Sequence, residues 1–194
     1  MDKALFCAVA VVTALGLAAC VSPTARSFWI PARAMEPTLK IGDRILVETA
    51  SYISTKPKDG DIIVFYPPRE LGTVPFIKRI VASPYESLSM RHGKVVINGL
   101  AAHEPFITHP ADYDLEVRNY QIYVDAVPLD PTRSVTPAKS AWQSPDRVPD
   151  GYYVVLGDNR NDSNDSHLWG FLKRNQIIGK AQSIYWPLDR ITKL

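Results

Sequence analysis

Short runs of β-branched and aromatic residues, each bounded by turn residues, recur along the chain after Ser22. No stretch beyond that residue keeps the 3.6-residue apolar period of an amphipathic helix, and the 16 prolines of the chain would interrupt one. The sequence therefore predicts a mostly β fold, with antiparallel strands in a barrel-like or sandwich arrangement. Asn98-Gly99 is typical of a hairpin turn. The runs that we expect to form strands are 44–48, 61–65, 76–81, 94–97, 152–156 and 181–186.

The character of the chain changes between about Pro84 and Pro149. Strand signals become sparse there, and the stretch 128–149 is rich in Pro, Ser, Thr and Asp. One interpretation is that this stretch is a long surface segment of a single domain. The sequence contains no internal repeat that would divide it further.

The N-terminal segment is the most apolar part of the sequence. From Ala4 to Val21 it holds 18 residues without a charge. A helix of this length is about 27 Å long, close to the roughly 30 Å hydrocarbon thickness of a bilayer, so we expect membrane insertion. It is either a retained anchor or a segment removed at Leu17-Ala18-Ala19-Cys20, with Cys20 lipidated. The flanking charges leave its orientation open.

Charge and cysteine content exclude several function classes. The net charge is only +2, from 22 basic and 20 acidic residues, so we expect no nucleic-acid partner. Cys7 and Cys20 both lie in the apolar segment, which leaves the rest of the chain without a thiol for metal binding or nucleophilic chemistry. The histidines lack the spacing of a zinc-binding helix, so no metal or cofactor is expected; they are His92, His103, His109 and His167.

Three blocks of sequence carry a family resemblance. They are Ile30-Pro31-Ala32-Arg33-Ala34-Met35-Glu36-Pro37-Thr38-Leu39, Phe76-Ile77-Lys78-Arg79-Ile80-Val81 and the segment from Gly157 to Ser166. In this order, after an apolar segment, they resemble the type I signal peptidases, which are membrane-anchored proteases with a Ser/Lys dyad. The resemblance covers most of 28–83 and 150–187. The variant Asp165-Ser166-His167-Leu168-Trp169-Gly170 is similar to cyanobacterial and thylakoid members in particular.

The resemblance assigns a role to each block. Lys78 matches the general base, although a lysine in a strand would on pattern alone face solvent. Because the pKa of a free lysine is about 10.4, burial must lower it before the amine is a useful base. Ser163 matches the residue that orients the lysine amine through a hydrogen bond, and Asp165 belongs to a supporting ion pair. The remaining supporting positions are Ala32, Met35, Asp158 and Arg160.

The chain departs from the family at the decisive position. Ala34 has a methyl group where the family has its serine nucleophile, and loss of such a nucleophile costs about 10⁶-fold in turnover. Ala32 stands where many members carry a serine that helps bind the oxyanion, yet the backbone N–H of Ala34 could still donate. His167 replaces the usual arginine partner of Asp165. Thr38 carries a nearby hydroxyl, for which we expect a structural role.

The resemblance also implies an organisation and a function. Residues 1–25 would form a membrane anchor, 26–83 and 150–194 a catalytic-type β domain, and 84–149 an inserted β lobe. Substrates would be exported preproteins, whose signal peptides bind as an extended strand on the non-cytoplasmic side of a plasma or thylakoid membrane. Partners would thus be signal peptides and the lipid bilayer.

Three hypotheses remain open on sequence. The chain is a signal peptidase that cleaves despite Ala34, or an inactive member, natural or engineered, that binds signal peptides or a partner without cutting. A lipid-anchored surface protein of unrelated role is the third, and it rests on Leu17–Cys20 alone.

Overall fold

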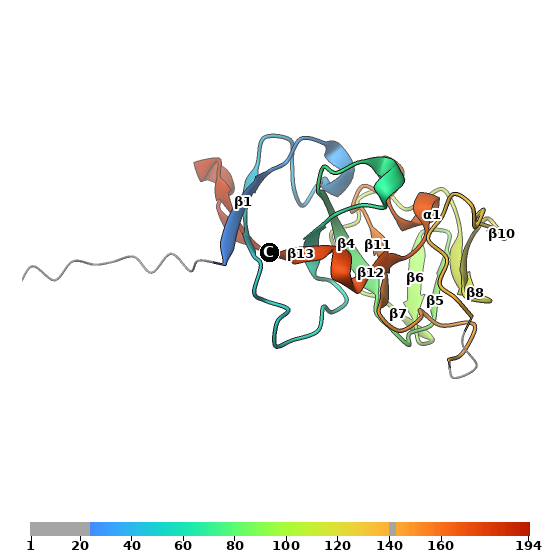
Figure 1. The fold of residues 1–194 in the computed structure, drawn as a ribbon. Helices are drawn as coiled ribbons and strands as arrows, with labels where there is room; N and C mark the ends of the chain where they lie inside the picture. The colour runs from blue at the N-terminus through green and yellow to red at the C-terminus, as the bar shows by residue number, and fades with distance from the viewer. Residues whose placement is uncertain (1–23, 140–142) are drawn as a thin grey trace, which may run out of the picture.

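The computed structural model describes residues 24–139 and 143–194 (Figure 1). The predicted anchor, 4–21, and Cys20 lie outside these residues. Among the residues that are described, no helix has the length and apolar character needed to cross a bilayer.

Two sheets form the molecule, and every pairing between their strands is antiparallel, which confirms the predicted mostly β, antiparallel fold. The larger sheet has eight strands in the order β1-β2-β13-β3-β4-β11-β12, with β14 paired to β13. Its strands are β1 (Ala25–Trp29), β2 (Arg44–Glu48), β3 (Ile62–Phe65), β4 (Phe76–Ala82), β11 (Tyr152–Leu156), β12 (Leu172–Lys173), β13 (Ile177–Trp186) and β14 (Thr192–Lys193).

The smaller sheet has six strands in the order β10-β9-β8-β5-β6-β7 and lies at the end of the molecule opposite β1 (Figure 1). It falls within 84–149, where few strands were expected, while the division of the chain into domains stays a prediction. Asn98-Gly99 connects β6 to β7 with both residues at positive φ, as predicted. The strands are β5 (Leu88–Arg91), β6 (Lys94–Ile97), β7 (Leu100–Ala101), β8 (Leu115–Arg118), β9 (Gln121–Val124) and β10 (Val127–Pro128).

Helices are short and few among the described residues. Four are 3-10 turns, and one is a single α-helical turn that Asp165 caps through its side chain. They are η1 (Arg33–Met35), η2 (Arg69–Leu71), α1 (Ser166–Trp169), η3 (Arg174–Gln176) and η4 (Leu188–Arg190).

The central strands of the larger sheet are buried on both faces, which explains their continuous apolar runs. In β3, Ile62 and Val64 pack with η1 and β2, while Ile63 and Phe65 pack with β11 and α1 on the opposite face. β4 and β11 then continue into a core that includes residues of the smaller sheet. The two sheets therefore meet through a shared core, and the lysine strand β4 lies next to that junction.

Candidate active site

Position 34 lies in η1, a turn fixed on both sides. Ala32 and Glu36 flank it with extended backbones, and the proline after Glu36 favours that conformation. Met35 is 2% exposed and packs into the core beneath the turn. The carbonyl of Ala34 accepts a hydrogen bond from the backbone N–H of Asn159 at 3.1 Å. The first and third sequence blocks are thus joined at the residue to which the resemblance assigns the position of the serine.

Lys78 is a buried amine that forms no ion pair with an acidic residue in the described part of the chain. It pairs with Ile63 across β3 and β4 and is only 5% exposed, so the lysine does not face solvent as a strand lysine usually would. Its Nζ lies 5.5 Å from the centroid of the Phe76 ring and makes no hydrogen bond or ion pair with any described residue. Burial lowers the pKa of Lys78, and the charges of Asp165 and Asp158 only partly oppose this.

The side chain of Arg79 lies on the opposite face of β4 from Lys78, where it contacts residues that support the site. It donates to both oxygens of Asp158, with Nε–Oδ1 at 2.8 Å and Nη2–Oδ2 at 2.7 Å, and stacks on the Phe106 ring at 3.8 Å. Asp158 also accepts from Thr38 Oγ1 at 2.5 Å. The hydroxyl of Thr38 is therefore engaged with Asp158, which agrees with the structural role expected for it.

Gly157 brings Ala34 and Ser163 together. A Cβ at this position would lie 2.3 Å from both the Ala34 carbonyl oxygen and Ser163 Oγ, so the close approach requires glycine. Ser163 Oγ is buried and has no hydrogen-bond partner among the described residues. The structure thus shows no hydrogen bond between Ser163 and Lys78, and the role that the resemblance implies for Ser163 stays a prediction.

Asp165 is fully buried and is held by three donors. It accepts from the N–H of Gly157 at 2.8 Å and from the N–H of His167 at 3.1 Å, and His167 Nδ1 lies 2.8 Å from its Oδ1. His167 thus occupies the place of the partner that the resemblance assigned to an arginine. Its ring stacks on Tyr113 at 4.5 Å between centroids, a contact that no sequence motif indicated.

Arg160 is 1% exposed and connects this turn to the loop between β7 and β8. It donates to the Gly157 carbonyl at 3.1 Å and to Glu104 Oε1 at 2.5 Å. Glu104, like Tyr113, comes from the 84–149 segment and was missed by the sequence analysis. These contacts stabilise the third sequence block, the segment from Gly157 to Ser166.

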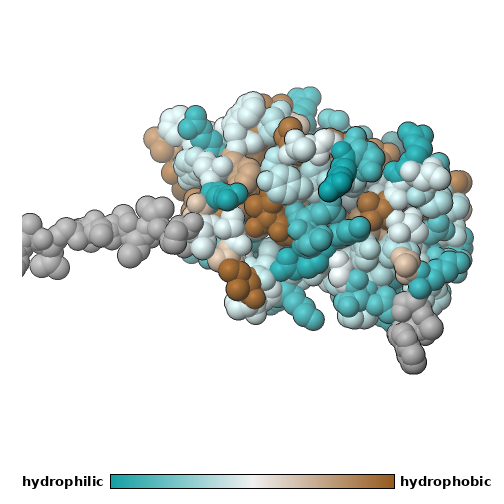
Figure 2. Space-filling model, viewed as in Figure 1, coloured by the Kyte–Doolittle hydropathy of each residue, from teal (hydrophilic) through white to brown (hydrophobic). Residues whose placement is uncertain are grey.

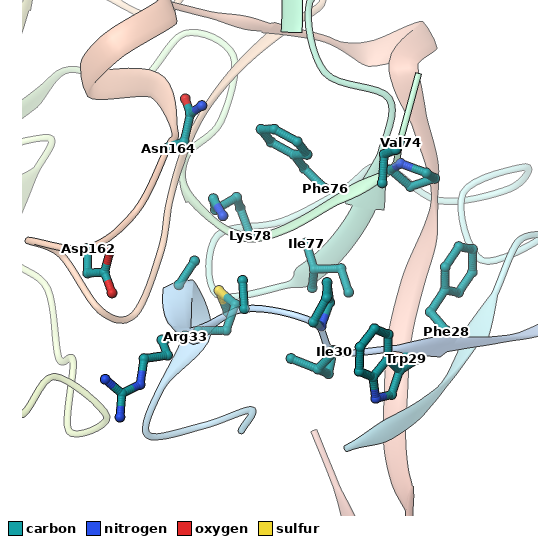
Figure 3. Close-up of a pocket in the computed structure, with 15 residues that line it drawn as sticks. Phe28, Trp29, Ile30, Arg33, Val74, Phe76, Ile77, Lys78, Asp162 and Asn164 are labelled. Carbon is teal, nitrogen blue, oxygen red and sulfur yellow. The ribbon is translucent and has the colours of Figure 1, made fainter. Parts of the chain in front are cut away.

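A mostly apolar cleft of about 610 Å³ runs along η1 and β4 (Figure 3). Four of the predicted site residues line it, and the other four support it from outside. Lys78 projects into it beside Phe76, while Asp162 and Asn164 lie across from them in Figure 3. The predicted residues in the lining are Ala32, Ala34, Met35 and Lys78, and the supporting residues are Asp158, Arg160, Ser163 and Asp165.

Comparison with known proteins identifies the family. The family described as "Signal peptidase, peptidase S26" matches residues 3–186. A protein named Signal peptidase I from Leptolyngbya laminosa is 36% identical over 192 residues, which cover 96% of this chain and 79% of the relative. A probable signal peptidase I-1 from Synechocystis sp. is 39% identical over 84% of this chain and 71% of its own length.

The thylakoidal processing peptidase 1 of Arabidopsis thaliana is 36% identical over 84% of this chain and 42% of its own length. The predicted similarity to cyanobacterial and thylakoid proteins is thereby confirmed. The chain belongs to the signal peptidase I family of serine endopeptidases.

Proposed function

We propose that the cleft binds the signal peptides of exported preproteins at the site where a signal peptidase cleaves them. The observation that carries this proposal is the meeting of Ala34 and Lys78 in one apolar cleft. A peptide bound there as an extended strand would place its scissile carbonyl over position 34, beside a desolvated amine. Small side chains would suit the shallow apolar surface on either side of η1.

The proposed roles follow from this placement. Lys78 is the general base, since burial favours the neutral amine that a base must present. The backbone N–H of Ala34 is the proposed oxyanion donor, while Ala32 contributes no hydroxyl to it. Ser163, Asp158, Arg160 and Asp165 hold the surrounding turn. No metal or cofactor takes part in this proposal.

Position 34 distinguishes cleavage from binding. Its methyl group cannot attack a carbonyl, and the hydroxyls of Thr38 and Ser163 do not line the cleft: Thr38 donates to Asp158, and Ser163 Oγ is buried. These observations favour the second candidate function, in which the chain binds signal peptides or a partner without cutting. A groove without a nucleophile would hold an uncleaved preprotein.

The proposed location is a plasma or thylakoid membrane that the chain crosses once, with the described domain on the non-cytoplasmic side. The 18 uncharged residues from Ala4 to Val21 support this proposal. The lipid bilayer is then the second partner. A lipidated Cys20 would give an anchored protein by a different route, and the position of the cleft near β1 is compatible with either.

The test compares the full chain with its Ala34→Ser variant on a model preprotein in detergent. We expect cleavage only in the variant, with a difference of about 10⁶-fold, because the serine oxygen completes the dyad. The double variant Ala34→Ser/Lys78→Met is the matched control and should lose cleavage while keeping preprotein binding. Equal cleavage by the full chain and its serine variant would show that another group supplies the nucleophile.

A further inference from the structure

The environment of the Lys78 amine favours its reaction as a nucleophile. It lies on the wall of a mostly apolar cleft, next to the Phe76 ring, and no described residue neutralises its charge through an ion pair. By contrast, Lys180 is paired with Asp61 at 2.6 Å, and Lys94 is exposed on β6. Among these three lysines only Lys78 is held both desolvated and unpaired.

The alanine at position 34 changes what this amine faces. In a Ser/Lys dyad a hydroxyl would stand between the amine and an electrophile in the cleft, and the lysine would act on the hydroxyl. Here a methyl group occupies that position, and Ala34 lines the same cleft as Lys78. An electrophilic carbon that enters the cleft therefore meets the lysine nitrogen as the nearest nucleophile.

We propose that Lys78 is a covalent capture site for small apolar aldehydes, which it binds as a Schiff base. A lysine desolvated in a hydrophobic pocket is the kind of amine that attacks carbonyl carbons. The apolar walls formed by Phe76, Ile77 and Ile30 select for an aldehyde with an aliphatic or aromatic body. This inference does not depend on signal-peptide binding.

The reaction balances without any further reactant. The lone pair of neutral Nζ forms a bond to the aldehyde carbon, the carbonyl π electrons move to oxygen, and one amine proton is transferred to that oxygen. The resulting carbinolamine loses its hydroxyl group and the second amine proton as water. The products are one imine and one water molecule, and no oxidation or reduction takes place.

The experiment labels the full chain in detergent with butanal and sodium cyanoborohydride, which reduces an imine to a stable secondary amine. Peptide mapping by mass spectrometry then gives the labelling rate of each lysine at pH 7. We expect Lys78 to be labelled severalfold faster than Lys94, because burial lowers the pKa of Lys78 and so raises the fraction of its amine that is neutral at pH 7. In urea the preference should disappear.

A variant at position 34, which leaves Lys78 in place, gives a second test. Ala34→Asp places a carboxylate in the cleft, which should hold Lys78 in its charged form and slow its labelling at least tenfold, with Lys94 unaffected. Labelling of Lys78 at the rate of Lys94 in the folded chain would overturn the proposal. So would unchanged labelling of Lys78 in the Ala34→Asp variant. Neither outcome depends on preprotein cleavage, so this inference can fail while the proposed function stands.

Discussion

The burial of Lys78 has a cost in stability that its neighbours do not remove. Its folded-state pKa is lowered from 10.5, mainly by desolvation, so the unfolded chain binds this proton more tightly than the folded one. The loss of stability caused by burial of the charged amine is therefore fully present below the folded-state pKa, and it diminishes as the pH rises towards 10.5. The burial that suits Lys78 to act as a base thus lowers the free energy of unfolding.

Replacement of this lysine should accordingly stabilise the protein. We predict that Lys78→Met raises the free energy of unfolding at pH 7 by about 1–3 kcal/mol, the usual cost of a buried polar group without a partner. Urea unfolding monitored by circular dichroism measures the difference, which should shrink as the pH is raised to 10. The exposed Lys94→Met is the matched control and should change stability by less than about 0.5 kcal/mol at either pH. A destabilising Lys78→Met would contradict the interpretation.

The site residues differ in how far sequence alone could identify them. Ala34 and Lys78 lie in blocks with several characteristic neighbours, so their meeting could be predicted from the resemblance. Tyr113 and Glu104 reach the site from the loop between β7 and β8 and belong to no motif. Their roles depend on contacts between residues distant in sequence, which local patterns do not encode.

At the scale of elements, the C-terminal turn η4 is tied to the segment after Ala34. Arg190 donates from Nε and Nη2 to the two oxygens of Asp43, both at 2.8 Å, and from Nη2 to the carbonyl of Thr38 at 3.2 Å. Asp43 is 1% exposed. Burial acts to raise its pKa, but the hydrogen bonds from Arg190 and the N–H of Lys40 outweigh burial, so the pKa lies below 3.8.

This tie gives a prediction with a defined pH dependence. Arg190→Gln should lower the free energy of unfolding at pH 7 by about 1.5–3 kcal/mol, because it removes the charge-assisted hydrogen bonds of Arg190 to the buried Asp43 carboxylate. Since the pKa of Asp43 is lowered, the stabilisation is present above 3.8 and is lost as the pH falls through the folded-state value. Urea unfolding at pH 7 and at pH 3 should therefore show a smaller difference at pH 3. Arg26→Gln, on the exposed face of β1, is the control.

Elements could be predicted where their residues match a simple pattern. The apolar run of β3 was predicted because both of its faces are buried, and β2 alternates buried and exposed residues between turns. β1 was missed because Ala25-Arg26-Ser27-Phe28-Trp29 contains no β-branched residue. β8 was missed because it is short and half polar, with Leu115 and Val117 buried and their neighbours facing outward.

At the scale of the whole molecule, one core unites the two sheets. It contains Val81 of β4 and Leu156 of β11 from the larger sheet, together with Met90 of β5 and Leu115 of β8 from the smaller one. The face of the molecule in Figure 2 shows apolar patches separated by hydrophilic surface. The smaller sheet therefore has its main apolar contact with the sheet that carries Lys78, and we expect the two to unfold together.

A substitution in the smaller sheet tests this cooperativity. Met90 is fully buried, so Met90→Ala should lower the free energy of unfolding by about 2–5 kcal/mol. Because the core is shared, hydrogen exchange in increasing urea should show β5 and β13 losing protection in the same transition, in the native chain and in the variant alike. Val127→Ala on the exposed strand β10 is the control, with an expected change within about 0.5 kcal/mol. If β5 loses protection at lower urea than β13, the smaller sheet is an independent unit, and the contacts of Glu104 and Tyr113, in the loop between β7 and β8, could open without loss of the cleft.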